Sequence, residues 1–299
     1  MELPVLITFY NRPENMRELL ARVADISGLQ LFFASDGPKS QRDSAQIEKC
    51  WEIVDEFFSH IPDTNRLKRT ANLGCKNAMK ENIDWFFSKN SFGVILEDDC
   101  YPHEEFFVQM SAVLSDSRLS KYLTVSSGNY LGETFTAPRA SVFPMIWGWG
   151  TWAENWHLYK QEITEPSRIL QFPANLIWPA KGRLKRFYFK NTFKKRFSEV
   201  ESGDLDTWDY SLTSTSWKFE RLNLHLGGNL VINGGFNLQA THTTSQAPSW
   251  VPSKYLVSPL DLKNIESYVP SLDQALAETV FNCTATSFIK NSVKRVLGR

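Results

Sequence analysis

Hydrophobic residues in the first half of the chain follow two alternating patterns. Short continuous apolar runs have the length of strands that are buried on both faces of a sheet. Between these runs, apolar residues recur three and four positions apart, as on one face of an amphipathic helix. The apolar runs are residues 3–9, 31–35, 92–96 and 123–127, with a shorter segment at 66–71, and the helical patterns begin near Pro13, Ile47, Met79 and Glu105. Strands that alternate with helices predict an α/β fold with right-handed crossovers and a largely parallel sheet.

Aromatic and glycine residues crowd together at residues 143–152. Thr151 and Glu154 have the spacing of a capping box, which predicts a short helix that ends near Trp156. Glycine lets the backbone pass closely under flat side chains. The stretch has two interpretations, a packed hinge between two halves of the chain or a wall of a substrate site, and both remain open.

A basic segment and an acidic segment follow one another in the second half. Residues 181–197 carry eight basic residues, no acids and interleaved aromatic residues, whereas residues 198–209 carry five acids. A solvated helix face is the favoured interpretation, on composition alone. The alternative is a surface that contacts a membrane or an anionic acceptor. The C-terminal residues 281–299 are also basic and are a second candidate for weak interfacial contact.

Composition excludes several classes of protein. With 42% hydrophobic and 22% charged residues among 299, the chain is globular. The 33 basic and 33 acidic residues cancel, so no overall charge attracts the protein to nucleic acid. The chain begins without a basic leader or an apolar run that could span a bilayer, so we expect a cytoplasmic protein. The four cysteines are far apart in sequence, which favours reduced thiols over a disulfide framework or a zinc site.

Three consecutive carboxylates, Glu97, Asp98 and Asp99, end the apolar run at 92–96. At the carboxyl end of a buried strand they would face the crevice in which open α/β sheets bind ligands. Crowded carboxylates repel one another unless a cation or a donor compensates their charge. Oxygen ligands suit Mg²⁺ or Mn²⁺, so one interpretation is a metal site. The other is a solvated acidic turn, and the tripeptide alone does not separate the two.

Phosphate-binding loops of the usual kinds are missing from the sequence. There is no Gly-x-Gly-x-x-Gly after the first strand and no Walker motif, so NAD or ATP is not expected. A nucleotide-sugar whose diphosphate is held by a metal ion fits this pattern, because the ion would act as a Lewis acid on the leaving group. An inverting transfer also needs a carboxylate that deprotonates the acceptor, and residues 204–210 offer candidates. The polar turn at 233–236 and the lone His242 come late in the chain.

Several motifs together give the chain a recognisable resemblance. They are residues 7–13, 35–37, 72–74, 96–99, 147–152, 208–210 and 240–243. In this order they resemble GT-A-fold glycosyltransferases, with Glu97-Asp98-Asp99 in the place of the Asp-x-Asp motif. The set is similar to the inverting N-acetylglucosaminyltransferase I family and to the bacterial nucleotide-diphospho-sugar transferases of the hemolysin-like HlpA group. The resemblance covers about residues 3–245 and implies one GT-A domain, with a nucleotide-sugar half at 1–130, an acceptor half at 131–260 and a helical tail at 261–299.

The resemblance also implies a role for individual residues. Arg12, Asp36, Asn72 and Lys76 would line the nucleotide pocket, Glu97 and Asp98 would contact the donor, Asp99 and His242 would hold Mn²⁺ or Mg²⁺, and Asp209 would be the catalytic base. His242 resembles the late histidine that completes metal or diphosphate binding in many GT-A enzymes, although the N-acetylglucosaminyltransferase I family does not depend on one. The implied donor is a UDP-sugar, and the implied acceptor is a growing glycan or a lipid-linked glycan.

Two other functions are compatible with the same residues. A nucleotidyltransferase or phosphohydrolase would use the same cleft on a different bond. A non-enzymatic carbohydrate- or membrane-binding module would use the acids only to cap a strand, with residues 181–197 as its contact surface. Fold alone does not choose among them.

Overall fold

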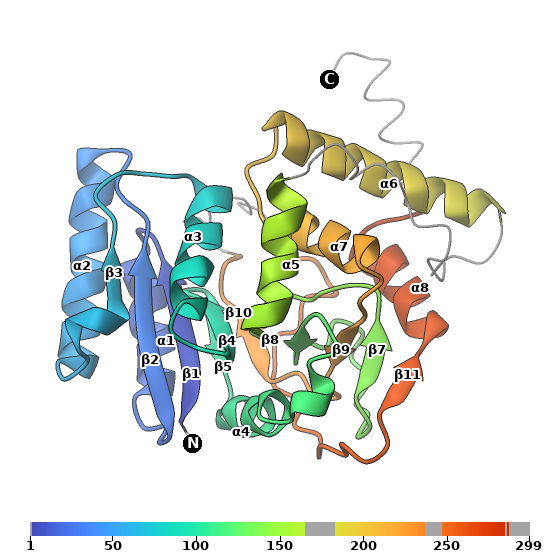
Figure 1. Cartoon of the computed structure of the whole chain (residues 1–299), viewed down its shortest axis with the longest axis horizontal. Helices are drawn as coiled ribbons and strands as arrows, with labels where there is room; N and C mark the ends of the chain where they lie inside the picture. Colours follow the sequence, from blue (N-terminus) through green and yellow to red (C-terminus); the bar gives the residue numbers. More distant parts are fainter. Residues whose placement is uncertain (1, 165–182, 237–246, 285, 287–299) are drawn as a thin grey trace.

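A single nine-stranded sheet runs through the computed structural model of the chain, which describes residues 2–164, 183–236, 247–284 and 286. The strand order is β11-β7-β9-β6-β8-β4-β1-β2-β3, and β5 pairs with β10 in a separate two-stranded sheet. Helices cover both faces of the large sheet (Figure 1). The predicted α/β class with a mostly parallel sheet is confirmed.

The N-terminal strands form the parallel half of the sheet. They are β1 (Leu3–Phe9), β2 (Leu29–Ser35), β3 (Arg66–Lys68) and β4 (Phe92–Glu97). β1 lies between β2 and β4, with Phe9 paired to Ser35 and Thr8 paired to Glu97. Each of these strands matches an apolar run predicted from the sequence. Because parallel strands end at one edge, this register brings their polar terminal residues together.

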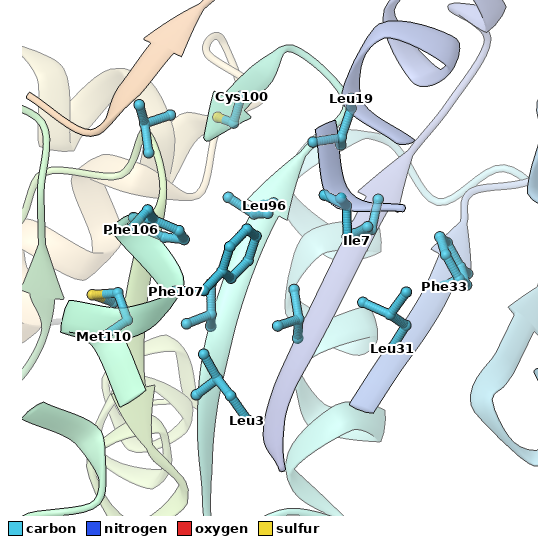
Figure 2. Packing of buried hydrophobic residues seen from close by; sticks show 14 of the residues in the cluster. Leu3, Ile7, Leu19, Leu31, Phe33, Leu96, Cys100, Phe106, Phe107 and Met110 are labelled. Atoms are coloured by element: carbon cyan, nitrogen blue, oxygen red, sulfur yellow. The ribbon is translucent and has the colours of Figure 1, made fainter. Parts of the chain in front are cut away.

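Side chains along these strands alternate between two cores. Ile7 of β1, Phe33 of β2 and Leu96 of β4 belong to a cluster with residues of α1, α2 and α4, and Figure 2 shows Leu19 of α1 beside Ile7. Leu6 lies on the other face, in the cluster that contains α3. The helices are α1 (Pro13–Val23), α2 (Gln41–Phe58), α3 (Cys75–Phe87) and α4 (Glu104–Leu114). A strand buried on both faces can be apolar throughout, which explains the continuous runs.

The second half of the chain extends the sheet with shorter, mixed strands. They are β6 (Val125–Ser126), β7 (Arg139–Ser141), β8 (Trp149–Trp152), β9 (Asn223–His225) and β11 (Glu266–Tyr268), with the small sheet made of β5 (Cys100–Pro102) and β10 (Val231–Asn233). β8 is antiparallel to both β4 and β6. Two short 3₁₀ turns, η1 (Asp63–Asn65) and η2 (Ser117–Leu119), complete the connections.

The predicted capping box at Thr151 is wrong. Thr151 is a residue of β8, and its hydroxyl donates a hydrogen bond to the Leu123 carbonyl at 2.6 Å. The helix that follows, α5 (Ala153–Thr164), also extends well past Trp156. The short-range signal failed because a strand pairing placed the hydroxyl against a neighbouring strand. The tryptophan stretch itself is mainly core, since Trp149 is buried and stacks on Trp208 with ring centroids 5.4 Å apart.

A third core holds the remaining helices, α6 (Arg183–Ser202), α7 (Asp209–Lys218) and α8 (Pro270–Thr279). Phe189, Phe193 and Phe197 of α6 are buried in it. In the segment predicted as a helical tail, α8 is preceded by β11, which pairs with β7 at the edge of the sheet. The division of the chain at residues 130 and 260 stays a prediction. Among the described residues, no helix has the length and apolar character needed to cross a membrane.

Asp273 anchors α8 to the sheet and makes stability sensitive to pH. Its carboxylate accepts hydrogen bonds from the Ser141 hydroxyl and, at 3.0 Å, from the Val142 backbone N–H. Burial raises its pKa from 3.8 to about 7, and these hydrogen bonds only partly oppose the shift. The folded protein therefore holds this proton more tightly than the unfolded chain does. The stability that the proton contributes is complete below about pH 4 and is lost as pH rises through about 7.

We expect Asp273→Asn, which mimics the protonated acid, to flatten the fall in unfolding free energy between pH 4 and pH 7. One proton taken up on folding gives a slope of about 1.4 kcal/mol per pH unit at most. Urea denaturation at several pH values measures the difference between the two proteins. Asp63→Asn, on an exposed turn, is the control. Parallel curves for wild type and Asp273→Asn would contradict this account.

Candidate functional site

A pocket of about 240 Å³ opens at the carboxyl ends of β1, β2 and β4. It combines an apolar wall with several convergent polar groups, as small-molecule sites do. Its lining residues are Thr8, Phe9, Tyr10, Arg12, Asp36, Lys39, Asn72, Gly74, Cys75, Ala78, Met79, Asn82, Glu97, Asp98, Asp99, Asp206 and Gly235. The sheet register therefore gathers residues that lie up to 227 positions apart in sequence, from Thr8 to Gly235.

Arg12 holds the acidic junction together. It lies just before α1, and its guanidinium reaches across to the end of β4. Arg12 Nε donates a hydrogen bond to Asp98 Oδ2 at 3.2 Å, and Arg12 Nη2 donates one to Asp98 Oδ1. Arg12 Nη1 donates to Asp99 Oδ2 at 3.0 Å. Asp98 is only 1% exposed, so this fork supplies the compensating charge that a buried carboxylate requires. The solvated acidic turn is thus excluded for Asp98.

The pKa of all three members of the cluster, Glu97, Asp98 and Arg12, is raised. Burial raises the pKa of Glu97 from 4.5 to about 8, and the charge of Asp99 adds to this, while Arg12 opposes it. Burial likewise raises the pKa of Asp98 to about 6, against the attraction of Arg12. For Arg12, burial acts to lower the pKa, but Asp98 and Asp99 outweigh it and raise it. The guanidinium therefore stays charged.

Asp36 shapes the pocket wall by fixing a loop. Its carboxylate accepts hydrogen bonds from the Asn72 side chain at 2.9 Å and from the backbone N–H groups of Leu73 and Gly74. Asn72 also donates to the Gly37 carbonyl at 2.7 Å. Both predicted residues line the pocket, but the Asp36 oxygens are engaged by the protein. Asp36 thus positions the loop that begins α3.

Asp206 joins the far half of the chain to this pocket. Its two oxygens accept the backbone N–H groups of Cys75 and Lys76, each at 2.9 Å, at the start of α3. The first-turn N–H groups of a helix have no partner within the helix, so a carboxylate there is favourable. Gly74 leaves room for it, since a Cβ at Gly74 would lie 2.8 Å from Asp206 Oδ2. Sequence reasoning included Asp206 only among the candidate bases of residues 204–210 and missed this contact, because nothing local predicts a partner 130 residues away.

Lys76 was predicted to line the nucleotide pocket, but it is not among the residues that do so. Its Nζ points instead to the Val200 carbonyl of α6, at 3.5 Å. The pocket residues that the sequence did not single out include Lys39, Asn82 and Tyr10. Asn82 donates to the Thr8 hydroxyl at 3.0 Å and so joins α3 to β1. Helical spacing marked this helix but could not show which polar residue faces the site.

The predicted base, Asp209, is the first residue of α7. Its Oδ1 accepts hydrogen bonds from the Thr207 hydroxyl at 2.5 Å and from its neighbour's backbone, Tyr210 N–H, at 2.8 Å. It is not among the lining residues of the pocket, but its charge contributes to the raised pKa of Glu97. Asp209 therefore lies beside the acidic cluster rather than within it. The predicted metal ligand His242 lies outside the described residues.

Gly235 closes the pocket on the side of Asp99. A Cβ at this position would lie 2.3 Å from Asp99 Oδ2, so only glycine allows the backbone to pass so close. The neighbouring Gly234 N–H donates to the Asp99 carbonyl at 2.7 Å. The polar turn after β10, a candidate from sequence, is thus part of the same site.

The acidic cluster offers a limited set of ligands for a divalent cation. Arg12 engages both oxygens of Asp98 and one of Asp99, whereas the Glu97 carboxylate has no hydrogen-bond partner in the described part of the chain. Within that part, no group of three or more histidine, cysteine, aspartate or glutamate residues forms a metal site. Two carboxylates nevertheless fit Mg²⁺ or Mn²⁺, which commonly bind one or two carboxylates and complete their shell with substrate phosphates.

Comparison with known proteins gives only distant likenesses. No family model and no curated protein matches the sequence. Among solved structures, S. aureus TarS residues 1–349 are 11% identical, with 74% of this chain and 92% of that chain covered at a TM-score of 0.40. The mannosyltransferase PcManGT from Pyrobaculum calidifontis, in complex with GDP-Man and Mn²⁺, is 9% identical, with 72% of this chain and 69% of that chain covered at a TM-score of 0.39. The glycosyltransferase GlyE of Streptococcus pneumoniae TIGR4 is 11% identical, with 74% of this chain and 64% of that chain covered at a TM-score of 0.33.

The second is named as a mannosyltransferase and the third as a glycosyltransferase, but TM-scores of 0.40 or less carry no conclusion about this chain. The narrower resemblance to the HlpA group and to the N-acetylglucosaminyltransferase I family stays a prediction. What the site can do rests on its own geometry.

We predict that Arg12 and Asp98 are strongly coupled. Arg12→Met leaves buried carboxylates without a partner and should lower the unfolding free energy by about 3–5 kcal/mol. The double variant with Asp98→Asn should lose clearly less than the sum of the single losses. Urea denaturation measures all four proteins. Arg17→Met, which breaks an ion pair with Glu56 that is exposed on both sides, should change little. Additive single effects would contradict the coupling.

Proposed function

We propose that this chain is a glycosyltransferase of GT-A type that uses a nucleotide-sugar donor. The observation that carries the proposal is the pocket at the carboxyl edge of the parallel strands, with its Arg12-bound acidic cluster at one side. Ligands of open α/β sheets bind at this edge. The pocket lacks a glycine-rich phosphate loop, so it suits a donor whose diphosphate is held in another way.

The pocket volume supports binding of the nucleotide part of a donor. At about 240 Å³ it is smaller than pockets that enclose a whole drug-sized ligand. Ala78 and Met79 give an apolar floor for a base, and Lys39 and Asn72 give polar groups at the rim. The sugar and diphosphate would then extend toward Asp99 and Gly235. A UDP-sugar is the preferred donor.

A divalent ion, Mn²⁺ or Mg²⁺, would be held by the two predicted ligands Asp99 and His242, and Glu97 could add a further carboxylate. When bound, such an ion supplies positive charge for the departing diphosphate. Arg12 has a separate role, because it keeps Asp98 and Asp99 in place and already neutralises part of their charge. Asp98 is therefore a positioning residue toward the donor rather than a free ligand.

Proton transfer is assigned to Asp209. In an inverting transfer, one carboxylate accepts the proton of the acceptor hydroxyl as that oxygen attacks the anomeric carbon. Asp206 is less suited, because both of its oxygens are engaged by backbone N–H groups at the start of α3. Asp209, the first residue of α7, adds its charge to the raised pKa of Glu97, which supports a place near the cluster.

The acceptor is proposed to be a hydroxyl of a glycan or of a lipid-linked glycan in cytoplasmic synthesis of surface polysaccharide. A hexosyl or N-acetylhexosaminyl group would be transferred. A nucleotidyltransferase or phosphohydrolase on the same pocket is the second candidate. Separating free UDP from sugar 1-phosphate among the products distinguishes it from sugar transfer.

We expect UDP to bind this protein more tightly with Mn²⁺ than with EDTA. Asp99→Ala should remove most of that gain, on the order of tenfold in affinity or more. Calorimetric titration of UDP measures binding apart from turnover, and Asp63→Ala is the exposed control. Equal affinity with EDTA and in Asp99→Ala would overturn the metal assignment but leave the donor pocket standing.

Asp209→Asn should keep UDP affinity while kcat falls by about 10²- to 10⁴-fold, because the acceptor proton loses its base. Asp206→Asn should act differently, with a lower melting temperature and a raised KM, since it weakens the contact between α3 and the loop before α7. Transfer assays with melting curves on both variants test the distinction. Normal turnover of Asp209→Asn would move the base to Asp206 or Asp204.

A further inference from the structure

Helix α6 divides its side chains between the core and the outside. Phe189, Phe193 and Phe197, four positions apart, are buried and contact Trp217 of α7 with ring centroids 4.7–5.6 Å apart. Six of its basic residues are exposed, namely Arg183, Lys185, Arg186, Lys190, Lys194 and Lys195. Two of them form ion pairs, Lys185 with Glu278 and Lys195 with Glu199. The interleaved aromatic residues thus hold the helix on the protein, and the basic residues form its outer surface.

The outer surface also carries an exposed aromatic ring. Arg183, Phe187, Lys190 and Lys194 follow one another at the i, i+4, i+7, i+11 spacing of a single stripe on a helix. Phe187 is 49% exposed, one of three large hydrophobic residues exposed on the described part of the chain. Arg183 and Lys194 have no ion-pair partner among the described residues. No acid occurs between Arg183 and Ser198.

Helix α6 is connected to the pocket region through its C-terminal end. Figure 1 shows α6 at the end of the molecule toward which β1 and β2 run. Its last turn contacts the pocket region, because the Val200 carbonyl accepts from Lys76 of α3. The loop after α6 then brings Asp206 into the pocket wall. The last turn of α6 and the loop that follows it thus connect the helix to the pocket.

We propose that the outer face of α6 docks on an anionic phospholipid surface. Clustered cations are attracted to anionic headgroups, and an aromatic side chain among them can enter the headgroup region. The exposed Phe187 favours a lipid surface over a soluble polyanion, which would reward the cations but not the ring. Docking would present the pocket to acceptors carried in the same membrane. The proposal concerns binding and holds whether or not the transfer reaction is as proposed above.

The test is sedimentation of the full chain with vesicles at physiological ionic strength. We expect binding to vesicles of phosphatidylcholine with about 30% phosphatidylglycerol, which carry a negative surface charge. We expect little binding to vesicles of phosphatidylcholine alone. Lys190→Glu with Lys194→Glu should reduce partitioning by about tenfold or more, and Phe187→Ala should reduce it with the charge unchanged. The control variant, Lys49→Glu with Lys263→Glu, makes the same charge change at exposed positions elsewhere and should leave partitioning unchanged.

Three results would overturn the proposal. The first is that the protein shows no preference for anionic vesicles. The second is that the Lys49 and Lys263 control loses as much vesicle binding as the α6 variant. The third is that the protein binds soluble polyphosphate but not vesicles, and that Phe187→Ala leaves the polyphosphate binding unchanged. UDP affinity, measured on the same variants, separates this question from the donor site. Unchanged UDP affinity with lost vesicle binding supports docking, and melting temperatures equal to wild type show that the variants are folded.

Discussion

The ion pair between Arg12 and the two aspartates at the end of β4 is the interaction on which the candidate site depends. A carboxylate as buried as Asp98 is stable only with a paired charge. That charge comes from the residue just before α1, so the turn after β1 and the turn after β4 are fixed to one another. The parallel pairing of β1 with β4 makes this contact geometrically available. Fold and site thus depend on the same few atoms.

Other carboxylates at this edge fix the backbone. Asp36 holds the loop before α3, and Asp206 holds the first turn of α3 from the opposite half of the chain. In both cases the acid satisfies N–H groups that would otherwise lack a partner. The acids of the pocket therefore divide by role. Those engaged by the backbone set its shape, and Glu97 and Asp99 are the acids that we propose to face a ligand.

This division also explains why sequence alone gave an incomplete site. The motifs of the resemblance pointed to Arg12 and Asp36. The acidic cluster was recognisable because three adjacent acids, Glu97, Asp98 and Asp99, follow a buried apolar run. The role of Arg12 as their counter-charge was not recognisable, since the two segments are about 86 residues apart. Lys76 was assigned to the pocket by resemblance, and its side chain is directed to α6 instead. Thr151 has the spacing of a capping box, but it lies in β8, which pairs with β4 and β6, and its hydroxyl donates a hydrogen bond to the Leu123 carbonyl.

The amino-acid pattern by itself determined the order and type of the N-terminal elements, because burial on both faces demands continuous apolar strands and burial on one face demands helical spacing. It also located the acidic end of β4. The tertiary structure alone decided which charges meet, which acids are engaged by backbone amides, and which side of α6 faces outward. Those outcomes depend on contacts between segments remote in sequence, and local patterns carry no information about such partners.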